Sequence, residues 1–196
     1  MRAQISDYCA RIGQNPLLVQ GAGGNVSWKD GDVLWIKASG TWLRDAAHQD
    51  IFVPVALPEL QAALRAHQFD AQPRTLGDAR LKPSIETVLH ALLPQKIVVH
   101  VHAIEPLSWL VRADAAASVT QRMPVAFEHA MVPYRKPGKD LAQAVCEALE
   151  ARPNARAVLL MNHGVVVAGE TLAEVEDALN TLLSALPGTV SPEAPP

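Results

Sequence analysis

The sequence lacks the features that mark secreted, disulfide-stabilised or membrane-spanning chains. Only two of its 196 residues are cysteines, Cys9 and Cys146, which is too few for a disulfide framework and does not match the spacing of a cysteine metal motif. No apolar run approaches the roughly 18 residues that cross a bilayer. The N-terminal segment 1–13 also lacks the apolar core of a signal peptide. We therefore expect a cytoplasmic protein without a membrane partner.

The sequence also lacks an excess of charge of one sign. Its 17 Lys and Arg residues stand against 20 Asp and Glu residues, a formal net charge of −3, whereas a general nucleic-acid binder usually has a basic face. Hydrophobic residues make up 49% of the chain, which is enough for a substantial core, and the length suits one domain. We expect a single domain over residues 1–187, a disordered tail over 188–196, and no nucleic-acid partner.

Local patterns predict a mixture of helices and strands. The expected strands are 33–37, 96–103, 157–161 and 165–168. The expected helices are 1–13, 58–67, 84–93, 105–111, 138–151 and 171–186, the last with the capping-box pair Thr171 and Glu174. Residues 21–27 and 70–83 are expected to form loops because they are rich in glycine or proline. Since no strict strand–helix–strand repeat is present, the pattern indicates one α/β or α+β domain with helices covering a central sheet.

Two histidines lie close together on the strongest predicted strand. Successive side chains of a strand point to opposite faces, so His100 and His102 share one face at backbone positions about 7 Å apart. Two imidazoles in this arrangement can converge on one ion. The same pattern also fits two polar residues on a half-exposed strand face.

A third histidine strengthens the metal interpretation. His163 stands between two apolar strands, which places its imidazole at the rim of a sheet. Three histidines with one open position form a catalytic zinc site, whereas structural sites are normally closed by four protein ligands. A turn residue that hydrogen-bonds the backbone is the alternative. This argument does not extend to the other four histidines, which are His48, His67, His90 and His129, and we interpret His67 and His90 as ordinary helix residues.

Glu86 is a candidate acid or base. We expect Ser84 to be the N-cap of the predicted helix 84–93 and Glu86 to lie in its first turn. A carboxylate there can reach a metal held by the histidine strand, or stand beside it as a general acid/base. The helix dipole alone also favours a glutamate at such a position, and the spacing does not separate these interpretations.

The glycine-rich segment GAGGNVS, residues 21–27, is a candidate anion-binding loop. It matches neither the dinucleotide-binding pattern nor a P-loop. Its glycines nevertheless allow the backbone to approach a ligand and to present N–H groups to an anion. Ser39, Gly40, Thr41 and Ser84 add hydroxyl and amide donors. Together these residues can form a neutral anion pocket, although each loop alone is more typical of a turn.

Five segments in this order resemble the class II aldolase/adducin family: GAGGNVS, LWIKASGTWL, KPSIETVLHALLP, KIVVHVHA and MNHGVVVAGET. They span roughly residues 18–183. The resemblance is closest to the zinc-dependent sugar-phosphate aldolases, such as those that act on fuculose and rhamnulose phosphates. It implies an α/β fold with three α/β/α layers and a central, mainly antiparallel sheet. It also implies a homo-oligomer, with a tetramer favoured and active sites at subunit interfaces.

The resemblance assigns a role to each motif. In the family, the two histidines of the H-x-H strand and the later histidine bind zinc, and the glutamate of the P-S-x-E segment is the general acid/base. The corresponding metal ligands here are His100, His102 and His163, and the acid/base is Glu86. The residues that the resemblance assigns to the substrate phosphate are Asn25, Ser39, Gly40 and Ser84.

The chain departs from the family pattern at three places. Ile85 replaces a serine that is a possible phosphate donor in many members. Lys37 stands where some aldolases have threonine, so it can offer a positive charge to a phosphate or carboxylate, or simply lie exposed. Some relatives use a tyrosine of the neighbouring subunit to protonate the aldehyde, and we assign this role to neither Glu128 nor Tyr134.

The predicted function is a class II aldolase that reversibly cleaves a ketose or ketose 1-phosphate through a zinc-stabilised enediolate. Zn²⁺, or another divalent transition metal, is the expected cofactor, and the expected substrate is a small sugar or sugar phosphate. The alternatives are an epimerase, dehydratase or decarboxylase on the same metal site, an adducin-like interaction module without catalysis, and a metal-free binding protein. Because the adducin-like alternative predicts lost metal ligands, the three histidines and Glu86 favour an enzyme.

Overall fold

The computed structural model describes residues 1–78 and 80–188 of the chain, so all of the predicted tail except Gly188 lies outside the described residues. The described part contains a seven-stranded sheet in the order β3-β2-β1-β4-β7-β6-β5. Neighbouring strands run antiparallel, except that β5 and β6 are parallel. The strands are β1 (Asn25–Asp30), β2 (Val33–Lys37), β3 (Phe52–Ala56), β4 (Ile97–Val101), β5 (His129–Val132), β6 (Ala157–Leu160) and β7 (Gly164–Gly169).

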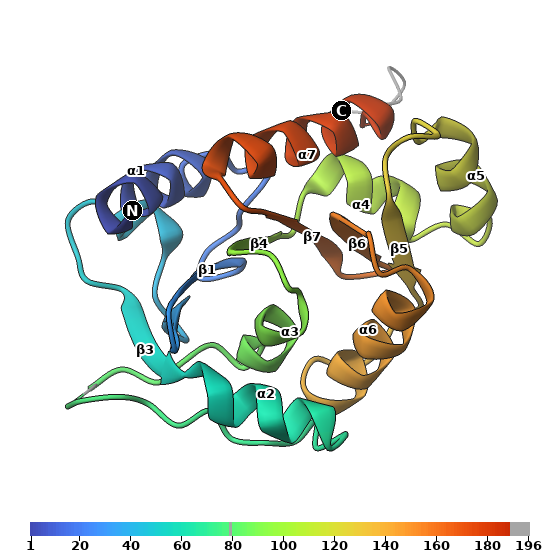
Figure 1. Ribbon diagram of the computed structural model, residues 1–196. Helices are drawn as coiled ribbons and strands as arrows, with labels where there is room; N and C mark the ends of the chain where they lie inside the picture. Colours follow the sequence, from blue (N-terminus) through green and yellow to red (C-terminus); the bar gives the residue numbers. More distant parts are fainter. Residues whose placement is uncertain (79, 189–196) are drawn as a thin grey trace.

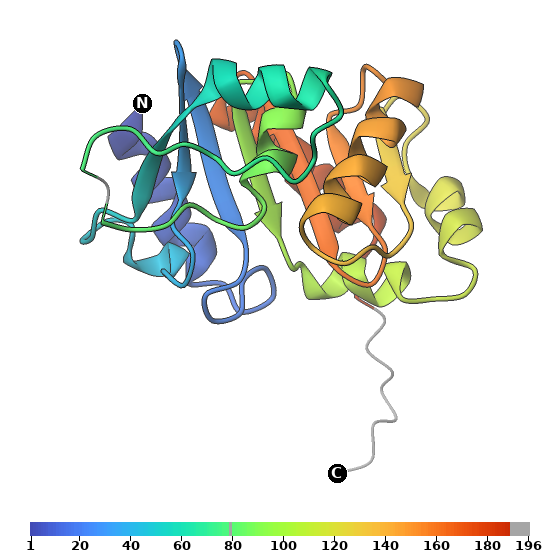
Figure 2. The ribbon, with the colours of Figure 1, turned by 90° about the horizontal axis from the view of Figure 1, so that it is seen from below.

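Helices cover both faces of this sheet, which makes three α/β/α layers (Figure 1). One face carries α1 (Arg2–Gly13), α4 (Ile104–Leu110) and α7 (Leu172–Ala185), with α5 (Ala115–Arg122) beside α4. The other face carries α2 (Leu57–Arg65), α3 (Thr87–Leu92) and α6 (Lys139–Ala151), which lie in front of the strands in Figure 2. A short 3₁₀ turn, η1 (Leu43–Asp45), follows β2. The predicted α/β fold with a mainly antiparallel central sheet is confirmed.

The alternation of side chains along the central strand β4 builds the two cores. Ile97, Val99 and Val101 are fully buried in the core that also contains side chains of α1, α4 and α7. Val98 points the other way, into the core that contains side chains of α3 and α6. His100 shares the face of Val98 because it lies two residues further along the strand. A polar side chain is therefore placed at the end of an otherwise apolar strand face.

Pairing across the sheet brings three distant segments together at one edge. The first residue of β1, Asn25, lies directly opposite His100 near the end of β4. Val101 lies opposite Val165, which follows the turn between β6 and β7. The end of the glycine-rich loop, the end of β4 and the β6–β7 turn therefore meet at this edge.

Several predicted boundaries are confirmed and others are wrong. The predicted strands at 33–37, 157–161 and 165–168 are present within a residue or so, and Thr171 Oγ1 accepts the predicted capping bond from the Glu174 N–H at 3.2 Å. The predicted loop over 21–27 ends early, because residues 25–27 form a strand between β2 and β4. Strands β3 and β5 were not predicted. Both are edge strands, and β3 contains Pro54, a residue that a sheet tolerates at its edge.

The helix predicted from Ser84 begins later than expected. Thr87 is the first residue of α3, and Glu86 occupies its N-cap position. Ser84 is therefore not the N-cap, and its hydroxyl instead accepts a hydrogen bond from the Glu86 N–H at 3.2 Å. Glu86 consequently stands at the junction of loop and helix instead of inside the first turn. Among the described helices, none combines the length and apolar character that crossing a membrane requires.

Candidate metal centre

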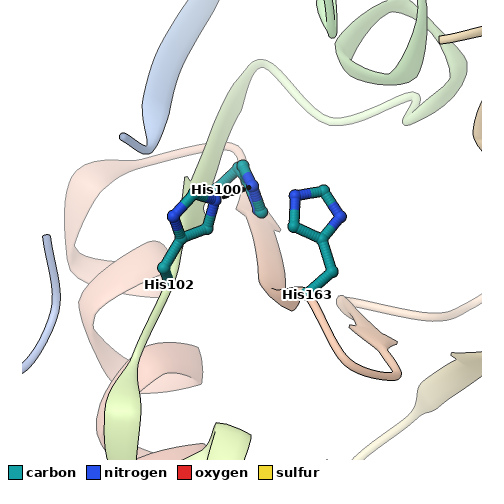
Figure 3. Close-up of side chains that lie close together, drawn as sticks. All are labelled: His100, His102 and His163. Atoms are coloured by element: carbon teal, nitrogen blue, oxygen red, sulfur yellow. Dashed lines mark hydrogen bonds between the residues drawn. The ribbon is translucent and has the colours of Figure 1, made fainter. Parts of the chain in front are cut away.

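Three histidines converge at the edge where β1, β4 and β7 meet (Figure 3). His100 is the fourth residue of β4, and His102 follows just beyond the end of this strand. His163 comes from the turn between β6 and β7, in which Asn162 adopts a left-handed conformation with φ 55°. Each histidine offers one nitrogen, and these atoms all lie within 4.8 Å of one another. The two distant parts of the predicted triad are thus brought together.

Hydrogen bonding prepares His100 to act as a ligand. Its Nδ1 donates to the Val165 carbonyl at 3.1 Å, and because a carbonyl only accepts, the proton must be on Nδ1. The lone pair of His100 is therefore on Nε2, which lies 3.1 Å from His102 Nε2. Two nitrogens on a tetrahedral zinc ion are separated by roughly 3.4 Å. The spacing and the tautomer both suit a shared cation.

The surroundings favour the neutral form of His102 and His163, which is the form that binds a metal. Burial, together with the neighbouring His100 and His163, lowers the pKa of His102 to about 4. Burial, followed by the influence of His100, also holds the pKa of His163 below its usual value. His163 and His102 therefore present neutral imidazoles at physiological pH.

Glu86 lies beside the triad. Its Oε2 is 3.5 Å from His100 Nε2, and its Oε1 is 3.4 Å from His163 Nε2. Burial raises the pKa of Glu86, but His100, the hydrogen bond from Asn25 and His163 outweigh it, so this pKa lies below its usual range. Oε2 accepts a hydrogen bond from Asn25 Nδ2 at 2.8 Å, whereas the buried Oε1 has no hydrogen-bond partner. An ionised carboxylate thus directs one free oxygen towards the site.

A fourth histidine, His90, lies behind Glu86. The sequence interpretation of His90 as an ordinary helix residue was wrong, because it is hydrogen-bonded to residues of the site. His90 is fully buried on α3, where its Nε2 hydrogen-bonds Asn25 Oδ1 and its Nδ1 hydrogen-bonds Ser27 Oγ at 2.7 Å. Two spacings in the sequence carry this signal. Glu86 and His90 lie four apart on one helix face, and Asn25 and Ser27 lie two apart on one strand face.

A pocket of about 260 Å³ opens next to the triad. The four residues assigned to the substrate phosphate all line it: Asn25, Ser39, Gly40 and Ser84. Glu86, His102 and His163 line the same pocket, while His100 is completely buried. Tyr134 is 54% exposed and, like Glu128, is not part of the pocket wall. The structure thus gathers the predicted site residues around one cavity.

Lys37 also lines the pocket, and it is only 2% exposed. Its Nζ donates to the Ala22 carbonyl at 3.0 Å and to the Ala38 carbonyl at 3.4 Å. Burial lowers the pKa of Lys37 to about 8, against the influence of Cys9 and Glu86. Among the described residues, it forms no ion pair with a carboxylate. The alternative of an exposed Lys37 is therefore wrong.

Two glycines allow the backbone to pack directly against the histidine strand. A Cβ atom on Gly164 would lie 2.5 Å from the Val101 carbonyl oxygen and 3.3 Å from the His100 ring. Gly24 has φ +68°, and a Cβ atom there would lie 2.9 Å from the His100 carbonyl oxygen. Only glycine allows the backbone to approach this closely at the two positions. The close approach brings the glycine-rich loop and the β6–β7 turn to the metal centre.

The residues present fit a divalent transition metal. Their donors are imidazole nitrogens at compatible separations, and the Glu86 carboxylate lies beside them. Three histidine ligands would leave an open coordination position. This is the arrangement of a catalytic site and not of a closed structural site.

Comparison with known proteins shows the family and the fold that this chain shares. The sequence model of the family described as Class II Aldolase and Adducin N-terminal domain matches residues 3–186. The fold is similar to the N-terminal class II aldolase domain of a conserved protein from Thermoplasma acidophilum, with a TM-score of 0.78, 27% identity, and 93% and 90% of the two chains covered. It is also similar to a sugar-phosphate aldolase from Thermotoga maritima, with a TM-score of 0.72, 19% identity, and 94% and 91% covered.

A curated relative is much longer than this chain. The protein named uncharacterized oxidoreductase YuxG, from Bacillus subtilis strain 168, is 29% identical over 177 residues, which cover 82% of this chain and 25% of the relative. The chain therefore spans about a quarter of the length of that protein.

Proposed function

Because the chain belongs to the Class II Aldolase and Adducin N-terminal domain family, we propose that it is a metal-dependent aldolase that reversibly cleaves a ketose or ketose 1-phosphate. The observation that carries this proposal is the convergence of three imidazoles beside one buried carboxylate. A non-catalytic module has no need of this arrangement. The branch that acts on fuculose or rhamnulose phosphates remains the expected one.

His100, His102 and His163 are the residues that would hold the metal, with zinc the expected ion. When bound, such an ion supplies a Lewis acid that polarises a carbonyl oxygen and stabilises negative charge on it. The Val165 carbonyl contributes by fixing the His100 tautomer, so that its Nε2 lone pair faces the site. Burial of this centre excludes water from its inner side.

Glu86 is proposed to move a proton at the carbon where the bond breaks and forms. In the condensation direction its carboxylate takes a proton from the carbon next to the ketone, leaving the electron pair to form the enediolate. In the cleavage direction the ionised Glu86 takes the hydroxyl proton of the departing aldehyde, and the bond between the two fragments breaks with its electron pair left on the ketone fragment as the enediolate. Glu86 then gives that proton to the enediolate carbon. Its ionised state and its unpartnered Oε1 support this role.

The pocket supports a substrate with an anionic group. Lys37 brings a positive charge into the cavity, where no carboxylate of the described residues forms an ion pair with it, and at pH 7 its amine is mostly protonated. Ser39 and Ser84 add hydroxyl donors on the same wall. Burying a cation is costly, and a bound phosphate would offset this cost by neutralising the Lys37 charge.

The proposal includes assembly of the chain with copies of itself, a tetramer being favoured. Ile85, which lines the catalytic pocket, is 69% exposed in the single chain. A neighbouring copy seated on this rim would cover an apolar side chain and complete the wall of the pocket. Light scattering of the purified protein measures the mass directly, and a monomer would contradict this part of the proposal.

The function is tested by metal analysis followed by a product assay. We expect about one equivalent of zinc per chain, lost in His102→Ala and retained in the matched variant His48→Ala, whose histidine is exposed and remote from the triad. Zinc-loaded protein is then incubated with ketose 1-phosphates. Release of dihydroxyacetone phosphate with an aldehyde supports the aldolase, whereas an isomerised, dehydrated or decarboxylated product indicates another reaction at the same centre.

A further inference from the structure

His90 touches none of the triad histidines in the hydrogen-bond network, yet it is joined to Glu86 through a single residue. We propose that His90 is a positioning residue that acts through Asn25 to hold the Glu86 carboxylate in place, with Oε2 anchored and Oε1 free. The proposal deepens the proposed function and rests on it for the measurement of turnover. The placement of Glu86 by His90 rests on the hydrogen bonds alone.

Two local geometries place the four side chains against one another. Glu86 and His90 are four residues apart, at the start and in the second turn of α3, and the His90 N–H donates to the Glu86 carbonyl at 3.2 Å. Asn25 and Ser27 are two residues apart on β1 and share one face of that strand. The face of α3 that carries Glu86 and His90 therefore lies over the face of β1 that carries Asn25 and Ser27.

The direction of each hydrogen bond follows from the amide of Asn25. Its Nδ2, which can only donate, donates to Glu86 Oε2 at 2.8 Å. Asn25 Oδ1 then faces His90 and needs a donor, which is the His90 Nε2–H. His90 Nδ1 is left with a lone pair that accepts the Ser27 hydroxyl proton at 2.7 Å. The chain of donors thus runs in one direction, from Ser27 to Glu86.

This chain of bonds determines which oxygen of Glu86 is available. Oε2 is held by Asn25, whereas Oε1 has no hydrogen-bond partner and lies 3.4 Å from His163 Nε2. If the Asn25 amide were reversed, its Oδ1 would oppose the carboxylate and push Glu86 away from the triad. His90 favours the observed orientation, because its Nε2–H satisfies the Asn25 Oδ1 that faces it.

Packing alone does not require a histidine here. The neighbouring Leu89 belongs to the buried apolar core that lies beneath α3, and His90 itself is completely buried. A leucine of similar size would fill this position without a polar group to satisfy. Both ring nitrogens of His90 are used instead on Asn25 and Ser27.

The experiment compares three variants of the full-length zinc-loaded protein. His90→Leu removes the donor to Asn25, His90→Gln keeps a donor at that position, and Leu89→Ala is the matched control that weakens the same helix without touching Asn25. We expect His90→Leu to lower kcat about 10- to 100-fold, the loss typical of a hydrogen bond that supports a charged group, with KM changed less than about threefold. His90→Gln should recover most of this rate, and Leu89→Ala should lower Tm but not kcat.

The coupling to Asn25 separates positioning from a general structural role. In an Asn25→Ala background, measured at high enzyme concentration, His90→Leu should cause little further loss, because its effect has already been removed. An equal loss of rate in both backgrounds, or a loss in Leu89→Ala as large as that in His90→Leu, would overturn the proposal.

A second readout does not depend on turnover. ¹⁵N NMR of histidine-labelled protein should show His90 as a neutral ring protonated on Nε2. A ring protonated on Nδ1 would mean that the Asn25 amide points the other way, and would refute the proposal. If the chain cleaves no ketose but His90 carries its proton on Nε2, the proposed function fails while the positioning of Glu86 stands.

Discussion

Acidification from pH 7 to pH 5 is predicted to destabilise the fold through His90. Burial, together with the nearby His100, lowers the pKa of His90 to about 3, whereas an unfolded histidine titrates near about 6.5. Between these two values the unfolded chain binds a proton at this residue that the folded chain does not bind. The neutral His90 therefore contributes to the free energy of unfolding. This contribution is fully present above about pH 6.5 and is lost as the pH falls towards 3.

The two pKa values determine the size of the effect. At pH 5 the unfolded residue is almost fully protonated and the folded residue is neutral, so the free energy of unfolding falls by about 2 kcal/mol relative to pH 7. This is a large share of the roughly 5–15 kcal/mol that stabilises a typical domain. Glu86 contributes little between pH 7 and pH 5. Its unperturbed pKa is roughly 4.3 and its pKa in the folded chain is lower, so it stays largely ionised in both states.

Urea unfolding of metal-free protein at pH 7, 6 and 5 measures this loss. His102 and His163 also have lowered pKa values and add acid sensitivity of the same sign, so the comparison must be made with a variant that changes His90 alone. His90→Gln has no titrating ring and should lose about 2 kcal/mol less than the wild type between pH 7 and pH 5. His48→Gln, at an exposed histidine, should follow the wild type. Equal losses in His90→Gln and the wild type would refute the reasoning.

Three further predictions concern other residues. Gly164→Ala should destabilise the protein by about 1–3 kcal/mol and lower its zinc content, because the new Cβ atom would lie 2.5 Å from the Val101 carbonyl oxygen. Urea unfolding measures the first effect and elemental analysis the second. An unchanged zinc content would contradict the argument. Lys37→Met should raise KM for a ketose 1-phosphate about tenfold with little change in kcat, and an unchanged KM in steady-state assays would exclude an anionic group at this wall. Thr171→Ala should cost about 1 kcal/mol in urea unfolding through loss of the α7 cap, while Thr171→Ser retains it.

Much of the architecture could be predicted from short patterns. The apolar stripe of α6, the alternation along β4 and the cap at Thr171 are local signals, and the corresponding elements are present. The pairing of His100 with His102 follows from the two-residue period of a strand. His163 and Glu86 were candidates from their own local context, and the order of the motifs joined them to the histidine strand, to which no local spacing connects them.

The strands β1, β3 and β5 show where local patterns fail. Asn25 to Ser27 follow three glycines and look like the continuation of a loop, but their backbone groups pair with β2 on one side and β4 on the other. Pro54 argues against a strand in the sequence, yet an edge strand accepts it. In each case the partner strand, which lies far away in the chain, decides the conformation.

The amino-acid sequence alone determined strands β2, β4, β6 and β7 and most of the helices, because each depends on a few neighbouring residues. It also determined the shared face of His100 and His102 and the list of chemically capable side chains. Only the tertiary structure decided that Asn25 lies opposite His100, that Lys37 is buried in the pocket wall and that His90 stands behind Glu86. These relations depend on cross-strand register and on the packing of α3 against β1. Both are set by contacts between segments more than 60 residues apart, which no local period of the sequence encodes.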